Sequence, residues 1–199
     1  MEHVSWTQMA DGNQEDYEFL GKLYAEHTQG EVTENMVRLL DLMKGPKLGY
    51  QVDRYVHSLQ SASRALRADE SIDMVVACLL HDVGDPIAPE NHSSVAAAIL
   101  RPYIDDETHW VIKHHGLFQG YYYFHHMGGD RNARELHLGH EYYDTCVKFC
   151  DNYDQNCFDP DYPTLPIDDF IPMMEEVFAR DSKVFGVAPV GMTADIEVT

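Results

Sequence analysis

An apolar stretch that ends in a histidine and an aspartate is the strongest constraint on how this chain can fold. Residues 74–80 are all apolar, His81 and Asp82 follow them, and Gly84 stands where a helix would end. Adjacent helical residues project about 100° apart, so one small surface feature cannot satisfy both polar side chains. A carboxylate can contact two metal ions through its two oxygens, whereas a neutral imidazole binds one. The pair therefore suits a dinuclear centre in which Asp82 bridges two ions and His81 binds one of them.

Helical periodicity extends over much of the remaining chain. Apolar or small residues recur at steps of four and three along residues 52–66, and helical patterns also fall on residues 92–101, 105–115 and 133–149. Residues 116–130, which are aromatic between glycine pairs, read as neither a helix nor a strand. With no sign of strand pairing, we expect a mainly α fold in which a helical bundle surrounds an internal dinuclear metal site.

The length of the chain, 199 residues, is that of one domain with a sizeable core, so we expect a single domain over residues 1–199. Residues 1–14 are polar and aperiodic, and we expect them to form a loose N-terminal arm. Residues 187–199 are expected to form a loose C-terminal tail.

The formal net charge of -20 makes a polyanionic partner unfavourable, so we expect neither nucleic acid nor an anionic membrane as a partner. The N-terminus lacks the basic and apolar regions of a signal peptide, and the longest apolar run is too short to span a bilayer. Four cysteines show no disulfide framework. We therefore expect a cytoplasmic protein.

Histidines and aspartates on, or at the ends of, different helices are candidate metal ligands. They are His57, His81, Asp82, His92, His115 and Asp151. Four imidazoles with two carboxylates form a mixed nitrogen and oxygen set, which favours iron, manganese or a similar transition metal over calcium or magnesium. A structural zinc site would be richer in cysteine. The alternative for His57 alone is a half-buried histidine that is hydrogen-bonded to a neighbour.

The order H…HD…H…H…D of these residues resembles the HD-domain metalloproteins, over residues 50–162. Two segments resemble the oxygenase branch of that superfamily more closely than its phosphohydrolases. They are residues 112–116 (Ile-Lys-His-His-Gly), which precede an aromatic segment, and residues 148–153 (Lys-Phe-Cys-Asp-Asn-Tyr). That branch includes myo-inositol oxygenase and the dioxygenases that cleave the C–P bond of 1-hydroxyphosphonates. The resemblance implies two Fe ions as cofactor, in an Fe(II)/Fe(III) pair.

The same resemblance implies how the ligands are shared between the two irons. Asp82 would bridge, and the other ligands would divide into His57, His81 and Asp151 on one iron and His92 and His115 on the other. His114 competes with His115, which we prefer because it precedes a glycine as the family pattern requires. Asp154 competes with Asp151 in the same way.

Aromatic residues near these ligands suggest a substrate that carries a quaternary ammonium, because such a group binds aromatic faces by cation–π attraction. The resemblance implies a small organophosphonate and O2 as partners, and cleavage of (R)-1-hydroxy-2-(trimethylammonio)ethylphosphonate to glycine betaine and phosphate. The candidate substrate-binding residues are Tyr50, Arg54, Asp85, Phe118, Tyr121 and Tyr123. These aromatics could instead cover the core or a subunit interface, which leaves a homodimer open.

Three positions depart from the oxygenase pattern. Relatives often carry lysines where this chain has Gln119 and Gln155, and a histidine or lysine where it has Asp85. An anion-binding role of those residues therefore cannot be transferred, and it would have to pass to Arg54, Arg131, Arg134 or Lys113. Of these, Arg54 stands three residues before His57, on nearly the same helix face. The alternative function is an HD phosphohydrolase that acts on a nucleotide or phosphomonoester, whose metals activate water. A third reading is a metal-dependent sensor that binds a choline-like ligand without turnover.

Overall fold

The computed structural model describes residues 3–28 and 30–180, and within them every regular element is helical. The α-helices are α1 (Gln14–Thr28), α2 (Glu31–Asp41), α3 (Arg54–Arg67), α4 (Ile72–Leu80), α5 (His92–Leu100), α6 (Asp106–Tyr123), α7 (Tyr143–Phe149) and α8 (Ile171–Phe178). Short helical turns are η1 (Met9–Asp11), η2 (Pro89–Asn91), η3 (Phe124–Met127), η4 (Ala133–His137) and η6 (Ile167–Asp169), and η5 (Cys150–Asp154) is a π-helix. The prediction of a mainly α fold is confirmed.

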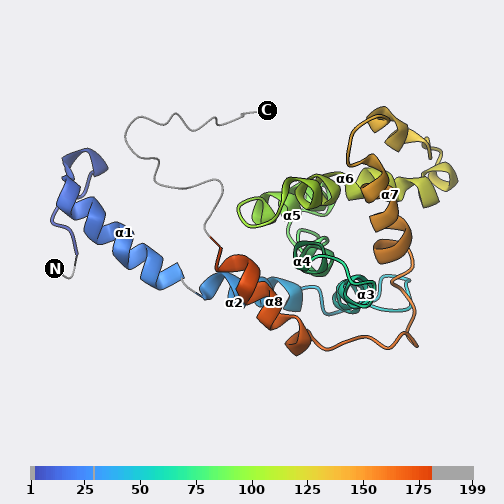
Figure 1. Ribbon diagram of the computed structural model, residues 1–199, viewed down its shortest axis with the longest axis horizontal. Coiled ribbons are helices and arrows are strands. Elements are labelled where there is room, and N and C mark those ends of the chain that lie inside the picture. The colour runs from blue at the N-terminus through green and yellow to red at the C-terminus, as the bar shows by residue number, and fades with distance from the viewer. Residues whose placement is uncertain (1–2, 29, 181–199) are drawn as a thin grey trace.

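Helix α4 is the centre of the bundle, with α3 on one side and α5 and α6 on another (Figure 1). Ser71 caps its N-terminus, where the side-chain oxygen accepts a hydrogen bond from the backbone N–H of Met74 at 3.2 Å. Leu79 and Leu80 are completely buried, and burying a leucine side chain contributes about 1.5–3 kcal/mol. Because α4 packs on all sides, the residues that follow it are held firmly inside the molecule.

Helix α3 is buried although its sequence is polar, and its polar side chains bind the backbone of the segment that follows η5. The side-chain amide of Gln60 donates to the carbonyl of Asp159 at 2.6 Å and accepts from the N–H of the same residue at 3.3 Å. The hydroxyl of Ser63 accepts from the N–H of Leu165 at 3.0 Å. These bonds satisfy buried polar groups and fix residues 156–165 against α3.

Helix α6 is longer than the sequence pattern indicates. Asp105 caps it by accepting from the N–H of Thr108 at 2.7 Å, and the helix continues through Gly116 and Gly120 to Tyr123. The prediction that residues 116–130 are irregular is therefore wrong for residues 116–123. Glycine lowers helix propensity by only about 1 kcal/mol, and packing against α5 and α7 outweighs that cost.

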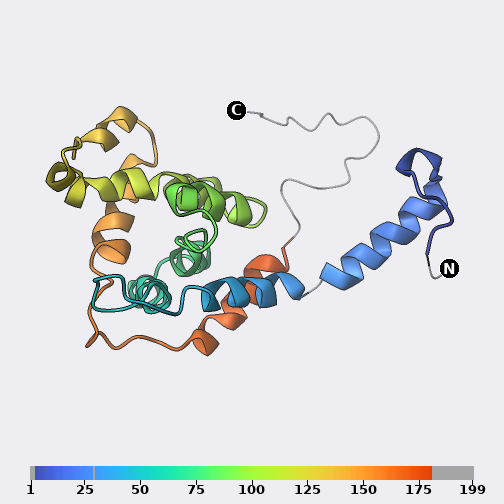
Figure 2. The same cartoon turned by 180° about the vertical axis from the view of Figure 1, so that it is seen from behind.

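The N-terminal region lies at the edge of the molecule. Helix α1 extends away from the body, and its main helical neighbour is α2 (Figures 1 and 2). The segment before it is partly tied down, because the indole N–H of Trp6 donates to Asp16 at 3.1 Å. The predicted tail over residues 187–199 lies outside the described residues. Within the described parts of the chain, no helix combines the length and apolar character that a membrane span requires.

Helix α6 also provides a test of the fold at acidic pH. Burial, with the nearby charges of Arg101 and Lys113, lowers the pKa of His109 from 6.5 to about 4. The unfolded chain therefore binds this proton more tightly, so the free energy of unfolding falls as the pH drops from 6.5 to 4. We expect the free energy of unfolding, measured by urea denaturation of the metal-free protein, to fall less between pH 7 and pH 5 for His109→Gln than for the natural chain. An equal loss in both proteins would contradict this placement of His109.

Candidate metal centre

Four histidines from four different segments turn the same ring nitrogen, Nε2, toward Asp82. They are His57 of α3, His81 directly after α4, His92 at the start of α5 and His115 of α6. Each Nδ1 lies within hydrogen-bond distance of a backbone carbonyl, respectively those of Cys157 (3.2 Å), Cys78 (2.7 Å), Pro89 (2.9 Å) and Ile112 (2.7 Å). A carbonyl can only accept, so Nδ1 carries the proton and Nε2 presents its lone pair to the cluster. At His92 the hydroxyl of Ser93 also lies 3.1 Å from Nε2.

The first group of ligand atoms is fully buried. The Nε2 atoms of His57 and His81 lie 3.1 Å apart, and Oδ2 of Asp82 is 3.4 Å from each of them. Oδ1 of Asp154 lies 3.4 Å from His57 Nε2 and 3.8 Å from His81 Nε2. Ligand atoms bound at about 2.0–2.2 Å to one ion are separated by roughly 3.0–3.6 Å. The separations of His57 Nε2 and His81 Nε2 from each other and from each carboxylate oxygen, 3.1–3.8 Å, are therefore close to those around a single transition-metal ion.

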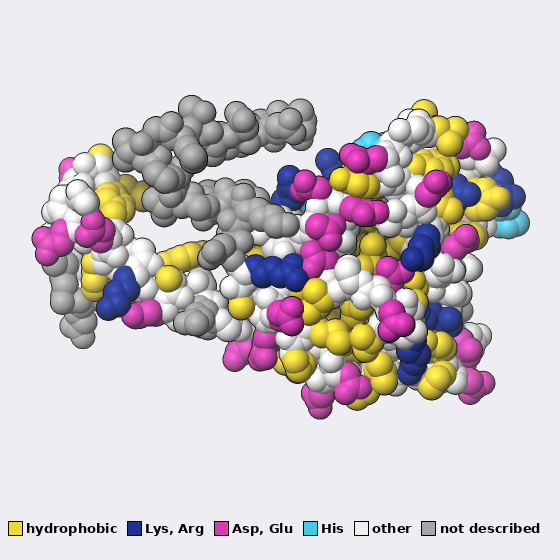
Figure 3. Space-filling model, viewed as in Figure 1, with side chains coloured by type: hydrophobic (Ala, Val, Ile, Leu, Met, Phe, Trp, Pro, Cys, Tyr) yellow, Lys and Arg dark blue, Asp and Glu magenta, His cyan; other side chains and the backbone are white. Residues whose placement is uncertain are grey.

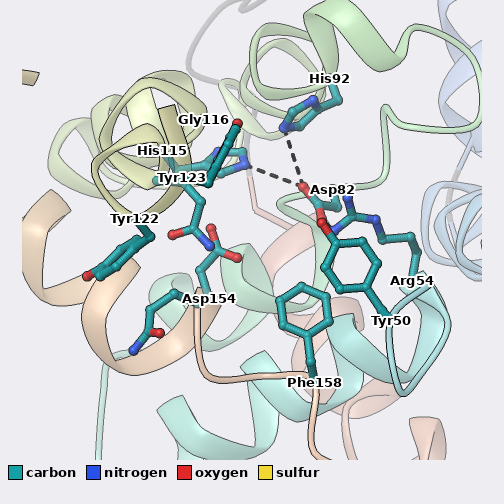
Figure 4. Close-up of a pocket in the computed structure, with 12 residues that line it drawn as sticks. Tyr50, Arg54, Asp82, His92, His115, Gly116, Tyr122, Tyr123, Asp154 and Phe158 are labelled. Carbon is teal, nitrogen blue, oxygen red and sulfur yellow. Dashed lines mark hydrogen bonds and ion pairs between the residues drawn. The ribbon is translucent and has the colours of Figure 1, made fainter. Parts of the chain in front are cut away.

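A second group forms on the other oxygen of Asp82. Oδ1 of Asp82 is 3.5 Å from Nε2 of His92 and 3.4 Å from Nε2 of His115 (Figure 4). Nε2 of His115 is buried and has no hydrogen-bond partner in the described structure. A buried polar atom without a partner is costly, and a metal ion between these three atoms would remove that cost.

The pKa shifts within the cluster indicate that a metal ion would replace a proton. Burial disfavours a charged imidazole, but the carboxylates of Asp82 and Asp154 outweigh it and raise the pKa of His81 to about 9. Burial also disfavours the carboxylate of Asp82, yet the neighbouring histidines hold its pKa well below the usual range. Without a metal, the cluster thus retains a proton among closely spaced lone pairs, and a cation that binds there displaces it.

The two groups differ in their access to solvent. His57 and His81 are completely buried, whereas the side chain of His92 is 25 % exposed. A cavity of about 300 Å³ opens beside the second group. Its walls are formed by Tyr50, Arg54, Asp82, His92, His115, Gly116, Gln119, Tyr122, Tyr123, Asp154, Gln155 and Phe158 (Figure 4). The first group therefore offers a buried ion site that meets the cavity only at Asp82 and Asp154, and the second offers an ion site that small molecules can reach.

Two glycines allow the second group to assemble. A Cβ on Gly84 would lie 2.7 Å from the backbone oxygen of His92, and a Cβ on Gly116 would lie 2.7 Å from Oγ of Ser93. A side chain on Gly84 would meet the backbone of His92 and displace the start of α5, whereas one on Gly116 would push aside the hydroxyl of Ser93. Glycine at position 84 therefore lets His92 approach Asp82 and His115.

The structure brings together five of the six predicted ligands, and it corrects the sixth. Asp151 is exposed and accepts a hydrogen bond from the hydroxyl of Tyr122, away from the histidines. Asp154 occupies the place expected of Asp151, because it is the carboxylate of η5 that faces the buried side. Of the adjacent histidines, His115 lies in the cluster, whereas His114 packs against the ring of Trp110.

The predicted substrate-binding residues separate into two sets. Tyr50, Arg54 and Tyr123 line the cavity, and Asp85 lies behind it, with Oδ2 at 3.2 Å from Nε of Arg54. Oδ1 of Asp85 is also 3.3 Å from Nδ1 of His92. Asp85 is therefore placed to orient Arg54 and His92.

Phe118 and Tyr121 do not line the cavity, which corrects their prediction. Phe118 is completely buried and packs on Trp110 and Tyr143, while the guanidiniums of two arginines cover the ring of Tyr121. The physical reason is that α6 continues through this segment, so successive aromatics point to different sides of the helix.

Phe158 is, with Tyr122, an aromatic lining residue that the predicted substrate-binding set lacks. Its ring stacks on His57 with a centroid distance of 4.4 Å and on Tyr50 with one of 4.5 Å. It lies in a proline-rich turn without periodicity, so only its nearness to Asp154 in the sequence could have indicated it.

The burial of Phe118 leads to a prediction about stability. We expect Phe118→Ala to lower the free energy of unfolding by about 3–5 kcal/mol, because it empties a large volume in the core. Tyr123→Ala, at a cavity residue that is 44 % exposed, should change this free energy much less. Urea denaturation of both variants provides the measurement. A smaller loss for Phe118→Ala than for Tyr123→Ala would mean that Phe118 is not a core residue.

Comparison with known proteins agrees with the architecture. Residues 54–156, just over half of the chain, match the HD domain family. No curated protein matches the chain. The matched segment contains every residue of the candidate metal centre. The chain therefore belongs to the HD domain family.

Proposed function

We propose that this protein is a dinuclear metal enzyme that uses O2 to cleave the C–P bond of a 1-hydroxyphosphonate. The observation that carries the proposal is the position of Asp82 between two groups of histidines. Its two oxygens face different histidine pairs, His57 with His81 and His92 with His115. A carboxylate in this position can bridge two ions, as the resemblance to the di-iron oxygenases requires.

The ligand set fits iron. Four imidazoles and two carboxylates form the mixed donor set that iron accepts in proteins, and no cysteine lies among them. When bound, an iron pair supplies the one-electron chemistry with O2 that the protein itself cannot perform. His57, His81, Asp82 and Asp154 would hold the buried ion, and His92 and His115 with Asp82 would hold the ion at the cavity.

Arg54 is the cation placed to bind the phosphonate. Among the described residues that line the cavity, Arg54 is the one basic side chain. Its guanidinium lies 3.3 Å from Oδ2 of Asp82 and 3.2 Å from Oδ2 of Asp85. These two carboxylates hold the side chain in place, and guanidinium donors that they leave free can bind a phosphonate oxygen.

The aromatic walls are suited to the methylated ammonium. The guanidinium of Arg54 already faces the rings of Tyr50 at 5.3 Å and Phe158 at 6.0 Å. A trimethylammonium group would therefore contact Tyr122 and Tyr123 on the other wall. The burial of His57 and His81 shields the first ion site from solvent.

The test compares iron-loaded protein with and without O2. We expect (R)-1-hydroxy-2-(trimethylammonio)ethylphosphonate to yield glycine betaine and phosphate, with matching O2 consumption and no product under nitrogen. Metal analysis with an EPR spectrum should give about two irons per chain and a coupled mixed-valent signal. A single metal per chain with full turnover would contradict the dinuclear assignment.

One observation favours a second candidate, an HD phosphohydrolase. Gln119 and Gln155 line the cavity where the oxygenases often carry lysines. Among the described residues of the cavity wall, Arg54 is therefore the one cation that can bind an anion. A hydrolase needs less of this charge, because its metals bind the phosphate and activate water. Release of phosphate from a phosphomonoester under nitrogen would identify this function. Tight binding of a choline-like ligand without turnover would instead identify a sensor.

A further inference from the structure

The hydroxyl of Ser93 lies against one of the metal-binding nitrogens. Its Oγ is 3.1 Å from Nε2 of His92, the neighbouring residue at the start of α5. Nδ1 of His92 faces the carbonyl of Pro89 at 2.9 Å and a carboxylate oxygen of Asp85 at 3.3 Å, and both are acceptors. Nδ1 therefore carries the proton, and the hydroxyl of Ser93 donates to the lone pair of Nε2.

His115, the other histidine of the second group, has no such contact. Its Nε2 is buried and has no hydrogen-bond partner in the described structure, although Oδ1 of Asp82 lies within 3.5 Å of both histidines (Figure 4). An ionised carboxylate has no proton to donate, so the hydroxyl of Ser93 is the donor among the described neighbours of His92 Nε2. The two histidines thus differ in what an incoming ion must displace.

Gly116 provides the space for this hydroxyl. A Cβ at position 116 would lie 2.7 Å from Oγ of Ser93, which is too close for two unbonded atoms, and 3.7 Å from Nε2 of His92. Gly116 also lines the cavity beside the second ion site. The missing side chain at this position therefore allows the contact between Ser93 and His92.

A neutral imidazole has one lone pair, on one nitrogen, so His92 cannot accept the hydrogen bond of Ser93 and bind an ion at the same time. We propose that the hydroxyl of Ser93 competes with the second ion for His92, which makes this ion the more weakly bound and exchangeable one of the pair. The inference rests on the dinuclear centre of the proposed function, and not on the reaction that the centre performs.

The carboxylates of the two sites support the same order of affinity. Oδ1 of Asp154 faces the histidines of the first ion site at 3.4 and 3.8 Å, in addition to Asp82. Asp85, the further carboxylate beside the second site, lies on the Nδ1 side of His92, opposite the nitrogen that would bind the ion. The second ion therefore has fewer negative ligands as well as a competitor.

The charge of the chain favours exchange at the second site. The chain contains 34 Asp and Glu residues against 14 Lys and Arg, and Figure 3 shows acidic side chains spread over the face in view. A negative surface raises the local concentration of cations. The cavity gives these cations access to His92, whereas His57 and His81 are completely buried.

The first test titrates Zn²⁺ into chelated protein at about pH 8, above the usual pKa of histidine, and follows binding by calorimetry. Zn²⁺ is redox-inactive and binds imidazole and carboxylate groups. We expect two binding steps, the second weaker than the first. Ser93→Ala should strengthen the second step about two- to tenfold, as one net hydrogen bond would, and leave the first unchanged. Ser94→Ala, the same change at the next and exposed residue, should change neither step.

NMR of the ring nitrogens in the metal-free protein gives a readout that needs no ion. We expect Nε2 of His92 to resonate upfield of Nε2 of His115, because a hydrogen bond to the lone pair shifts such a nitrogen upfield. Ser93→Ala and Gly116→Ala should both move the His92 resonance downfield, since the first removes the hydroxyl and the second displaces it. Ser94→Ala should leave it in place.

The outcomes separate this competition from the proposed reaction. A second step that is unchanged or weaker in Ser93→Ala, or a His92 resonance that neither variant moves, would overturn the competition and leave the reaction intact. A single Zn²⁺ per chain in every variant would overturn the dinuclear centre and the competition with it. Two binding steps with the expected response, but no turnover of the phosphonate by iron-loaded protein, would refute the proposed function alone.

Discussion

Asp82→Asn is expected to weaken both ion sites of the candidate metal centre. Each carboxylate oxygen of Asp82 faces one pair of histidines, at 3.4–3.5 Å from their Nε2 atoms. An asparagine of the same shape keeps one oxygen, replaces the other with an NH2 group and removes the negative charge. The NH2 group cannot bind a cation, so the bridge is lost whichever way the amide turns.

Metal content and activity measure this loss. We expect metal analysis to fall from about two ions per chain to one or fewer, and activity to fall more than about 100-fold, since even the loss of a group behind a ligand costs 10- to 100-fold. Asp85→Asn is the matched control, because Asp85 contacts His92 and Arg54 but no free Nε2 atom. It should lower metal affinity about tenfold. Two tightly bound ions in Asp82→Asn would refute the bridging role.

Much of the fold and most of the metal centre could be predicted because they depend on local patterns. The apolar run of α4 requires burial, so His81 and Asp82 at its end had to lie inside the bundle. The other histidines were predicted as ligands from their order along the chain, because helical periodicity does not show which residues of different helices are in contact. The position of His92 depends on the close approach that Gly84 permits, and single-sequence reasoning has no measure of such long-range packing.

The aromatic segment could not be interpreted correctly, because two glycines suggested an irregular loop. The helix instead continues to Tyr123, and the helical period assigns its aromatics to separate environments. Phe118 enters the core, Tyr121 lies under two guanidiniums, and Tyr122 and Tyr123 reach the cavity. Residues that are neighbours in the sequence therefore do not form one aromatic box.

The choice between Asp151 and Asp154 depended on helical register. Asp154 stands four residues after Cys150, which is itself four residues after Cys146, and all three are buried. This spacing places Asp154 on the inner face of the α7 and η5 segment. The backbone widens to a π-helix here, with the N–H of Gln155 donating to the carbonyl of Cys150 at 3.0 Å. The apolar stripe was the available signal, whereas the resemblance to a family pattern favoured Asp151.

Asp154→Asn and Asp151→Asn form a matched pair that tests this register, because the same change is made three residues apart on one turn. Among the described residues, two carboxylates face His57 and His81, and Asp154 is the one besides Asp82. Its loss should weaken binding of the buried ion by more than about 100-fold, and metal analysis after dialysis should show that ion missing.

Asp151→Asn should leave both ions in place, because Asp151 contacts Tyr122 and no histidine of the cluster. The hydroxyl of Tyr122 can still donate to the amide oxygen that remains, so the cavity wall should persist and activity should change only a few-fold. The two variants carry the same change in net charge, and a difference in metal content between them therefore reports position alone. If Asp151→Asn lost an ion while Asp154→Asn retained both, the assignment of Asp154 would be wrong, and the ligand would be the carboxylate that lies outside the cluster in this structure.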